Sequence, residues 1–575
     1  MIKEQWSVIN AKDVSNSVWD TVRCPGLTSS AKEIDNLKEA LRRAHNVFRY
    51  KRDVPLLWVV FIGGTGTGKS ILFNALCGTN ISDTGVERPK TQGPVIYYHR
   101  EKPIYDGFPF SEFSISNKIQ GEQTVQNRGS SGTFTVVSHS RDSIAHIAFV
   151  DTPDVDSLET RNREMADDFY LLSDVVIFVT SQEKYADEVP SQVFYRVYQD
   201  EKPCYFLLNK AGGELTQEEV LTFFAEKHVK ISPDTFRLIP YVSSPVSENV
   251  SSNRKFQEFA SSIFEMFDKT NFSRLYDESR ERNRKHLSAK ITTLLRLIDE
   301  EEEAALHWLD ELDVLFEENK EYLLLQLEHH YPASSREFIQ NEIRNIFKKY
   351  DLLRKPRRYL STIILTPFRL LGFRRVESRT HARELLNVGK KVDISPILAV
   401  IERFNRLVLE KLSPADDKVP LSQKMRNPDL VMTAEEVRTI VAREQENLAL
   451  WIEENFEEMA RSIPKSKEWG IYSTAVLWGI FIISFEIVLG GGIGILEAAL
   501  DSILAPFVTK GSVELFASRE IQKIARELDH RYREGLLYIL EEQKKRYRAA
   551  ALSLVTAPEV KKSIHAIVTE LERVV

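Results

Sequence analysis

The sequence predicts an α/β domain with a mostly parallel sheet and one antiparallel edge strand, followed by a long all-α helical bundle or stalk. Up to about residue 272, apolar runs of strand length alternate with amphipathic helical stretches. This alternation is typical of a parallel sheet that helices cover on both faces. Beyond that residue, long charged segments keep one apolar stripe and show no strand pattern. Such segments are typical of helices packed in a bundle.

Composition narrows the class of protein. The chain has 575 residues, too many for one hydrophobic core, and its 42% hydrophobic and 28% charged residues are typical of a folded protein. A net charge of -7 gives no general attraction to nucleic acid, so we expect no DNA partner. The three cysteines, Cys24, Cys77 and Cys204, have no metal-ligand spacing. Together with the lack of an apolar N-terminal signal, they favour a cytoplasmic location.

The expected elements follow one another in order along the chain. Residues 29–51 begin with a serine cap and repeat apolar residues at three- and four-residue spacing, which predicts a helix. The short polar connection SHSRDS between strands 133–137 and 144–150 predicts an antiparallel hairpin at the sheet edge. The other expected strands are 56–62, 174–180, 204–209 and 238–243. The expected helices are 70–77, 159–172, 216–227, 255–267, 274–350, 383–412, 433–462 and 512–573.

The stretch GGTGTGKS, residues 63–70, carries the strongest functional signal. It lies between an apolar strand and a helix and matches the phosphate-binding loop G-x-x-x-x-G-K-[ST]. Lys69 would reach the β- and γ-phosphates, and the Ser70 hydroxyl would bind Mg²⁺. The alternative is a glycine-rich turn without a ligand. The residues expected to contact nucleotide here are Gly63, Gly64, Thr65, Gly66, Thr67, Gly68, Lys69, Ser70 and Ile71.

Asp151 ends the strand in HIAFVDTPDVDS, where nucleotide hydrolases keep the carboxylate that holds Mg²⁺ through water. The segment ISDTGVERPKTQGP resembles the first switch of Era-like and dynamin-like GTPases, which implies that Thr91 closes on Mg²⁺ and the γ-phosphate. As alternatives, Asp151 caps the next turn and Thr91 is an ordinary loop residue.

Two further stretches resemble the base-binding part of such proteins. CYFLLNKAGG resembles the start of the guanine-recognition motif [NT]-K-x-D, with Asn209 and Lys210 in its first two positions. LIPYVSSP ends a strand where these proteins place their last base-contacting loop, at Ser243 and Ser244. The alternative for Asn209 and Lys210 is an ordinary strand-to-helix turn.

In this motif order, residues 55–270 are similar to the translation-factor-like class of GTPases, within its dynamin-like and Era-like branch. The resemblance implies GTP or GDP with Mg²⁺ as cofactors and attack of water on the γ-phosphate. It implies catalytic roles for Lys69, Thr91 and Asp151, with Ser70, Thr91 and Asp151 around the metal. It also implies a homo-oligomer whose self-association or membrane contact responds to the nucleotide.

Three departures from the family pattern affect these expectations. The motif D-x-x-G has become DTPD, so Asp154 replaces a glycine whose N–H contacts the γ-phosphate. NKAG places Gly212 where a carboxylate accepts two guanine N–H groups, which leaves Glu214 as a substitute and ATP as an alternative nucleotide. The hydrolytic glutamine is absent at Thr65 and at Val155, its two usual places, so intrinsic turnover should be slow.

Two segments suggest a membrane surface. Residues 352–375 contain seven basic residues and no acid around an apolar core, which suits anionic lipid. The alternatives are a basic loop packed on acidic helices and, less favoured, RNA. Residues 471–508 form two apolar arms around a glycine turn, as in a re-entrant hairpin. Glu486, Glu497 and Asp501 favour the alternative, a buried core hairpin.

The leading hypothesis is a dynamin-like GTPase, and the alternative is a nucleotide-gated scaffold that does not hydrolyse. A ribosome-associated GTPase is a further option. The expected domains are an N-terminal helical segment packing on the bundle (1–54), the nucleotide domain (55–272), the bundle (273–465), the apolar hairpin (466–510) and a charged C-terminal helix returning to the bundle (511–575).

Overall fold

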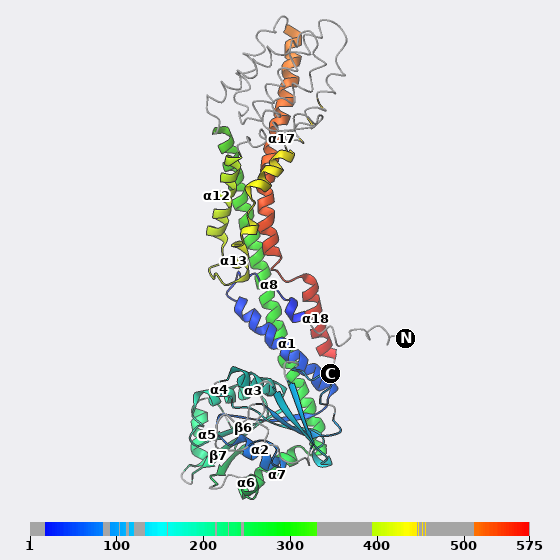
Figure 1. The fold of residues 1–575 in the computed structure, drawn as a ribbon, viewed down its shortest axis with the longest axis vertical. Helices are drawn as coiled ribbons and strands as arrows, with labels where there is room; N and C mark the ends of the chain where they lie inside the picture. Colours follow the sequence, from blue (N-terminus) through cyan, green and yellow to red (C-terminus); the bar gives the residue numbers. More distant parts are fainter. Residues whose placement is uncertain are drawn as a thin grey trace, which may run out of the picture. The chain divides into compact units, whose positions relative to one another are not determined.

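A computed structural model provides the fold (Figure 1). It describes residues 18–329, 394–444 and 511–573, together with 447, 451 and 455. Within these ranges it omits 84–92, 103, 111–113, 120–132, 158, 213–214, 228, 230 and 243–246.

The chain divides into two compact units. The first contains the residues up to Val22, Glu33–Arg296 and the residues from Pro558. The second contains Arg23–Lys32 and Leu297–Ala557, so the boundary falls inside one long helix, α8 (Lys269–His329). Each unit has a core of its own and is described separately below.

The first unit is built on an eight-stranded sheet with the order β3-β4-β2-β5-β1-β6-β7-β8. Neighbouring strands from β5 to β8 are parallel, as the sequence predicts for a mostly parallel sheet. The strands are β1 (Leu57–Gly63), β2 (Val95–His99), β3 (Ser114–Ile119), β4 (Thr133–His139), β5 (Ile147–Asp151), β6 (Val175–Ser181), β7 (Cys204–Ala211) and β8 (Phe236–Pro240).

Alternation along β1 shows how the sheet is buried on both faces. Trp58, Val60 and Ile62 face one core cluster, while Val59 and Phe61 face the other. Because successive side chains of a strand point to opposite faces, a strand covered on both sides reads as one continuous apolar run. All seven residues of β1 are buried.

Helices cover both faces of this sheet (Figure 1). Those after β5, β6 and β7 pack on one face, and those after β1 and β8 pack on the other. The sequence pattern did not predict α4. Besides the first part of α8, the α-helices of this unit, not all of which touch the sheet, are α1 (Ala31–Asp53), α2 (Lys69–Cys77), α3 (Thr160–Leu172), α4 (Glu188–Gln199), α5 (Gln217–Glu226), α6 (Ser247–Ser251), α7 (Arg254–Met266) and α18 (Pro558–Arg573).

The predicted hairpin between 133–137 and 144–150 is wrong. β2 lies between β4 and β5, pairing in parallel with β4 and antiparallel with β5. The connection 140–146 can extend about 20 Å, which is enough to pass one strand and reach a position about 10 Å away. The antiparallel part is therefore three strands, β3, β4 and β2, and not one edge strand.

The pattern did not predict β2 and β3, and it misjudged one expected helix. The run VIYYH that forms β2 is short, although its β-branched and aromatic residues suit a strand. The expected helix 512–573 is interrupted at 553–557, and a new helix, α18, begins at Pro558. Proline suits the first turn of a helix because its missing N–H has no partner there.

Although the sequence assigned residues 1–54 to the bundle, α1 counts with the sheet unit, and its Val47 and Tyr50 belong to the sheet core. The Tyr50 hydroxyl donates to the Ile104 carbonyl at 3.0 Å. These contacts place the C-terminal half of α1 against the sheet.

The second unit is all helical in its described part. It contains the rest of α8, α12 (Ser395–Leu412), α13 (Pro420–Met425), the helical residues 434–444 and α17 (Gly511–Leu552). Trp308 of α8 donates its indole N–H to the Leu412 carbonyl at 2.8 Å. This apolar core confirms the predicted helical region.

A buried carboxylate fixes the segment 23–32 in this second unit. Glu301 of α8 is 2% exposed and accepts the backbone N–H groups of Gly26, Leu27 and Thr28 at 2.8–3.0 Å. Gly26 has φ +82, and a Cβ there would lie 2.5 Å from the Val419 side chain. A buried charge is stable only when hydrogen bonds replace its water, and these backbone donors do so.

None of the described helices has both the length and the apolar composition that crossing a bilayer requires. The two segments expected at a membrane, 352–375 and 471–508, lie outside the described residues.

Candidate functional site

The phosphate-binding loop connects β1 to α2, as the sequence predicts. Gly66 and Gly68 have φ of 73 and 90, a region that L side chains rarely adopt. A Cβ at Gly63 would lie 2.0 Å from the Val179 carbonyl, and one at Gly68 would lie 2.3 Å from Asn209 Nδ2. Only glycine therefore fits this turn, which leaves the N-terminus of α2 facing the site and suited to an anion.

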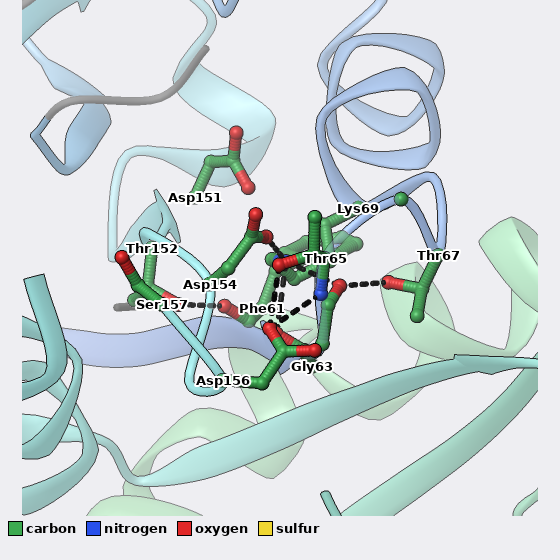
Figure 2. A network of polar contacts seen from close by, with 12 residues as sticks. Phe61, Gly63, Thr65, Thr67, Lys69, Asp151, Thr152, Asp154, Asp156 and Ser157 are labelled. Atoms are coloured by element: carbon green, nitrogen blue, oxygen red, sulfur yellow. Dashed lines mark hydrogen bonds and ion pairs between the residues drawn. The ribbon is translucent and has the colours of Figure 1, made fainter. Parts of the chain in front are cut away.

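Lys69 is buried at the start of α2, and its ammonium group binds other groups of the site (Figure 2). Its Nζ donates to the carbonyls of Gly63 at 2.9 Å and Gly64 at 3.1 Å. It also forms an ion pair with Asp154. The side chains of Lys69 and Asp154 are 5% and 24% exposed.

Residues 152–157, the acidic loop, follow β5 and contact both the end of β1 and the phosphate-binding loop (Figure 2). The Thr152 hydroxyl donates to the Phe61 carbonyl at 2.7 Å, and Val155 N–H donates to the Gly63 carbonyl at 3.3 Å. Asp154 and Asp156 of the same loop bind Lys69 and Thr65.

Asp156 and Lys184 were not predicted to belong to the site. Asp156 accepts the backbone N–H and the hydroxyl of Thr65 at 2.7 and 2.6 Å, and its other oxygen lies 3.3 Å from Lys184 Nζ. Burial raises the pKa of Asp156, but the Thr65 hydrogen bonds and the Lys184 charge outweigh it and lower the pKa overall. Asp156 therefore stays ionised and holds Thr65 in place.

Asp151 is fully buried at the end of β5, with its Oδ2 accepting the Ser82 hydroxyl at 2.6 Å. Burial raises its pKa, and hydrogen bonds from Ser70 and Ser82 and the nearby Lys69 charge oppose the rise. Within the part of the chain that the structure describes, Oδ1 has no hydrogen-bond partner.

These groups fit a divalent cation. An unsatisfied buried carboxylate oxygen is costly, and Mg²⁺ prefers carboxylate and hydroxyl oxygens. Asp151 and Ser70, which the sequence predicted around a metal, lie close enough for Ser70 to lower the pKa of Asp151.

Ser82 is held by Asn74 of α2, and the sequence reasoning missed both. Asn74 donates to the Ser82 carbonyl at 2.8 Å and accepts the N–H of Ser82 at 2.9 Å and of Ile81 at 3.1 Å. A clue was present in the sequence, because an asparagine inside the apolar helix ILFNALC needs buried partners.

The strand end NKAG lies against the phosphate-binding loop. Asn209 Nδ2 donates to the Thr67 carbonyl at 2.9 Å, and Lys210 Nζ donates to the Gly66 carbonyl at 2.7 Å. Gly212 N–H donates to Gln182 Oε1 at 2.5 Å, a contact that the sequence did not indicate. Among the residues with described side chains, this end of β7 offers amide and ammonium groups to the loop and no carboxylate.

The structure thus brings together the loop 63–70, Asp151, Asn209 and Lys210. Ile71 is partly buried and packs on the apolar core. The remaining expected site residues, Thr91, Ser243 and Ser244, and the substitute Glu214 lie outside the described residues.

Residues 58–210 match the protein family described as 50S ribosome-binding GTPase. This match confirms the predicted resemblance to P-loop GTPases for the sheet unit. A protein of Caldicellulosiruptor sp. (strain Rt8B.4), described as an uncharacterized protein in the xynA 3'region, is 25% identical over 220 residues. The alignment covers 36% of this chain and spans about half, 53%, of that relative.

Two solved structures from work on an oligomerised bacterial dynamin pair, described as a mechanism for long-range sensing and tethering of membranes, are also similar. They are 15% and 14% identical, and the alignments cover 95% and 94% of this chain and 81% and 89% of theirs. Their TM-scores are 0.27 and 0.32, so no conclusion about this chain rests on them.

Proposed function

We propose that this chain binds GTP and GDP with Mg²⁺ and hydrolyses GTP slowly, as a nucleotide-dependent switch. One observation carries the proposal above the others. The buried carboxylate of Asp151, with one oxygen unsatisfied among the described residues, lies near Ser70 and Lys69, which both oppose the rise in its pKa. The family match over residues 58–210 supports the same reading.

Different groups of the site bind different parts of the triphosphate and its metal ion. The backbone N–H groups of the loop and the N-terminus of α2 bind phosphate oxygens, and Lys69 neutralises charge on the distal ones. Ser70, Asp151 and, as proposed from the sequence, Thr91 would hold Mg²⁺, which offsets the charge that develops as the γ-phosphate leaves.

Slow turnover follows from Thr65 and Val155, the two positions without glutamine. In addition, Asp156 accepts both the N–H and the hydroxyl of Thr65. Thr65 is thereby tied to the acidic loop and is poorly placed to orient water. A partner or second copy would then be needed to orient the attacking water.

Guanine selectivity needs a direct test, because Gly212 stands where the family motif has the carboxylate that accepts guanine N–H groups. Calorimetric titration of the full chain with GTP, GDP and ATP in Mg²⁺ tests it. We expect micromolar binding of guanine nucleotides and weaker binding of ATP. Equal or tighter binding of ATP, or binding of none of the three, would contradict the guanine assignment.

The second candidate is a nucleotide-gated scaffold that does not hydrolyse, and the ion pair of Asp154 with Lys69 favours it. Phosphate release measured over several turnovers, with a GTPase-dead Lys69→Ala control, separates the two. Release above that control supports hydrolysis, and release equal to it supports the scaffold.

For coupling to a membrane, we propose that residues 352–375 contact anionic lipid at the cytoplasmic face and that the chain self-associates. The support is the run of seven basic residues around an apolar core. Sedimentation with vesicles of phosphatidylserine and with neutral phosphatidylcholine tests this. Binding should require the anionic lipid and weaken when Arg354, Lys355, Arg357 and Arg358 are changed to Gln. Equal binding to both vesicles, or none, would contradict it.

A further inference from the structure

The ammonium of Lys69 has its hydrogen-bonding capacity filled from within the chain. A lysine ammonium has three donors. Two go to the carbonyls of Gly63 and Gly64, at 2.9 and 3.1 Å, and the third side is taken by the carboxylate of Asp154. A phosphate can therefore reach Lys69 only by replacing one of these acceptors.

Asp154 is the acceptor that can leave most easily. The two carbonyls belong to the backbone of the tight turn, which glycine geometry fixes. Asp154 is a side chain, is 24% exposed, and can rotate towards solvent. The acidic loop would stay in place, since Thr152 contacts Phe61 of β1, and Val155 and Asp156 contact the phosphate-binding loop.

The charge around Asp154 decides which nucleotide is disfavoured. Three carboxylates gather here, those of Asp151, Asp154 and Asp156, against the ammonium groups of Lys69 and Lys184. In phosphate-binding loops the backbone cradles the inner phosphates, and the lysine reaches the distal ones. A carboxylate bound to the lysine therefore competes mainly with the last phosphate, and its negative charge also repels that phosphate.

We propose that Asp154 is a specificity-determining residue that competes with the γ-phosphate for Lys69, so that the site favours the diphosphate over the triphosphate. This inference rests on the proposed guanine-nucleotide function and concerns the same site. Binding of the triphosphate requires Asp154 to turn away from Lys69, whereas the diphosphate leaves more of their contact intact.

The test measures the ratio of two affinities in wild type and in Asp154→Asn. Both are titrated with GDP and with the non-hydrolysable analogue guanylyl imidodiphosphate in Mg²⁺. Asparagine keeps the size of the side chain and removes its charge. We expect Asp154→Asn to shift the ratio about tenfold towards the triphosphate analogue, because like charges in a partly exposed site interact at an intermediate dielectric.

Asp156→Asn is the matched control. This substitution removes the same charge from the same loop. The Asp156 side chain, however, contacts Thr65 and Lys184 and not Lys69. A ratio that stays unchanged in Asp154→Asn, or that shifts equally in Asp156→Asn, overturns the inference and leaves guanine-nucleotide binding intact. If neither wild type nor Asp154→Asn binds either nucleotide, the proposed function fails and the inference fails with it. Thermal unfolding of each variant checks that it is folded.

Discussion

Two lysine–aspartate pairs lie at opposite ends of the parallel strands, and they differ in how fully the aspartate is held. Lys69 and Asp154 follow the carboxyl ends of β1 and β5. Asp174 directly precedes β6 and binds Trp58 near the start of β1, and Lys51 of α1 pairs with it there.

At that starting end, Asp174 has every oxygen in use. Its Oδ1 accepts from Lys51 and from the hydroxyl of Ser279, and its Oδ2 accepts the Trp58 N–H at 2.8 Å. The side chains of Lys51 and Asp174 are 8% and 3% exposed. Burial lowers the pKa of Lys51, although Asp174 opposes the shift.

Asp154, by contrast, has Lys69 as its only ion-pair partner among the described residues and is 24% exposed. The buried Lys51–Asp174 pair joins α1, β6 and α8, and breaking it costs much folding free energy. The partly exposed Lys69–Asp154 pair can exchange one partner for a ligand. We therefore interpret the first pair as structural and the second as replaceable by ligand.

The largest expected effect comes from Asp174→Ala. It leaves the Lys51 charge buried without a partner, which should lower the free energy of unfolding by about 3–5 kcal/mol. Denaturant unfolding of the full chain measures it. As a matched control, Asp167→Ala breaks the exposed pair with Arg196 and should cost less than about 1 kcal/mol. The double variant Lys51→Met with Asp174→Asn should recover much of the loss; if it does not, the stranded charge is not the cause.

The next largest effect separates the alanine variants of the two lysines, one of which should lose binding and the other stability. Lys69→Ala should weaken guanine-nucleotide binding about 100-fold, because Lys69 supplies the charge that meets the distal phosphates. It should cost little stability, since Asp154 can turn to solvent. Lys51→Ala should do the reverse, lowering stability while nucleotide affinity stays within about twofold of wild type. Similar binding losses in both variants, measured by calorimetry at a temperature where each is folded, would remove the distinction between the pairs.

A smaller effect is expected for Asp151→Asn. Burial raises the pKa of Asp151 in the folded chain above its usual value of 3.8. A carboxyl of this kind favours folding while it is protonated, below the unfolded pKa, and that contribution is lost as pH rises through the folded pKa. At neutral pH the ionised group therefore costs stability, and Asn removes the cost. We expect a higher unfolding midpoint without nucleotide but about tenfold weaker binding of Mg²⁺–nucleotide. A lower midpoint without nucleotide would contradict this account.

The smallest expected effect comes from Ser279→Ala, which removes one of the groups bound to Asp174. Lys51 and the Trp58 N–H still hold the carboxylate, so the loss should be about 1 kcal/mol. Ser262→Ala on α7, whose hydroxyl bonds a helical carbonyl at 2.7 Å, is a control for the serine change itself. Equal losses in both would show that the Asp174 contact adds nothing.

Short-range features of this fold were predictable because their cause lies in neighbouring residues. The loop 63–70, the run of β1 and the helix that became α1 each follow from local glycine geometry or apolar spacing. The capping box of α5, in which Thr216 and Glu219 satisfy each other's backbone N–H, likewise depends on four adjacent residues alone.

Longer-range features were not predictable in this way. A polar connection of seven residues, 140–146, suits a hairpin and a step over β2 equally, and pairing decides between them. The partners of Asp174 lie 123, 116 and 105 positions away along the chain, so no local pattern joins them.

By itself, the sequence determined that this chain has a phosphate-binding loop between a strand and a helix, with an aspartate at the end of a nearby strand. These features depend on contiguous residues and on the preference of each backbone conformation for particular side chains. Only the tertiary structure decided that Asp154 turns towards Lys69, that Asp156 holds Thr65, and that Ser82 reaches Asp151. The physical reason is that the orientation of a charged side chain depends on which opposite charges and donors the folded chain brings within a few ångströms of it.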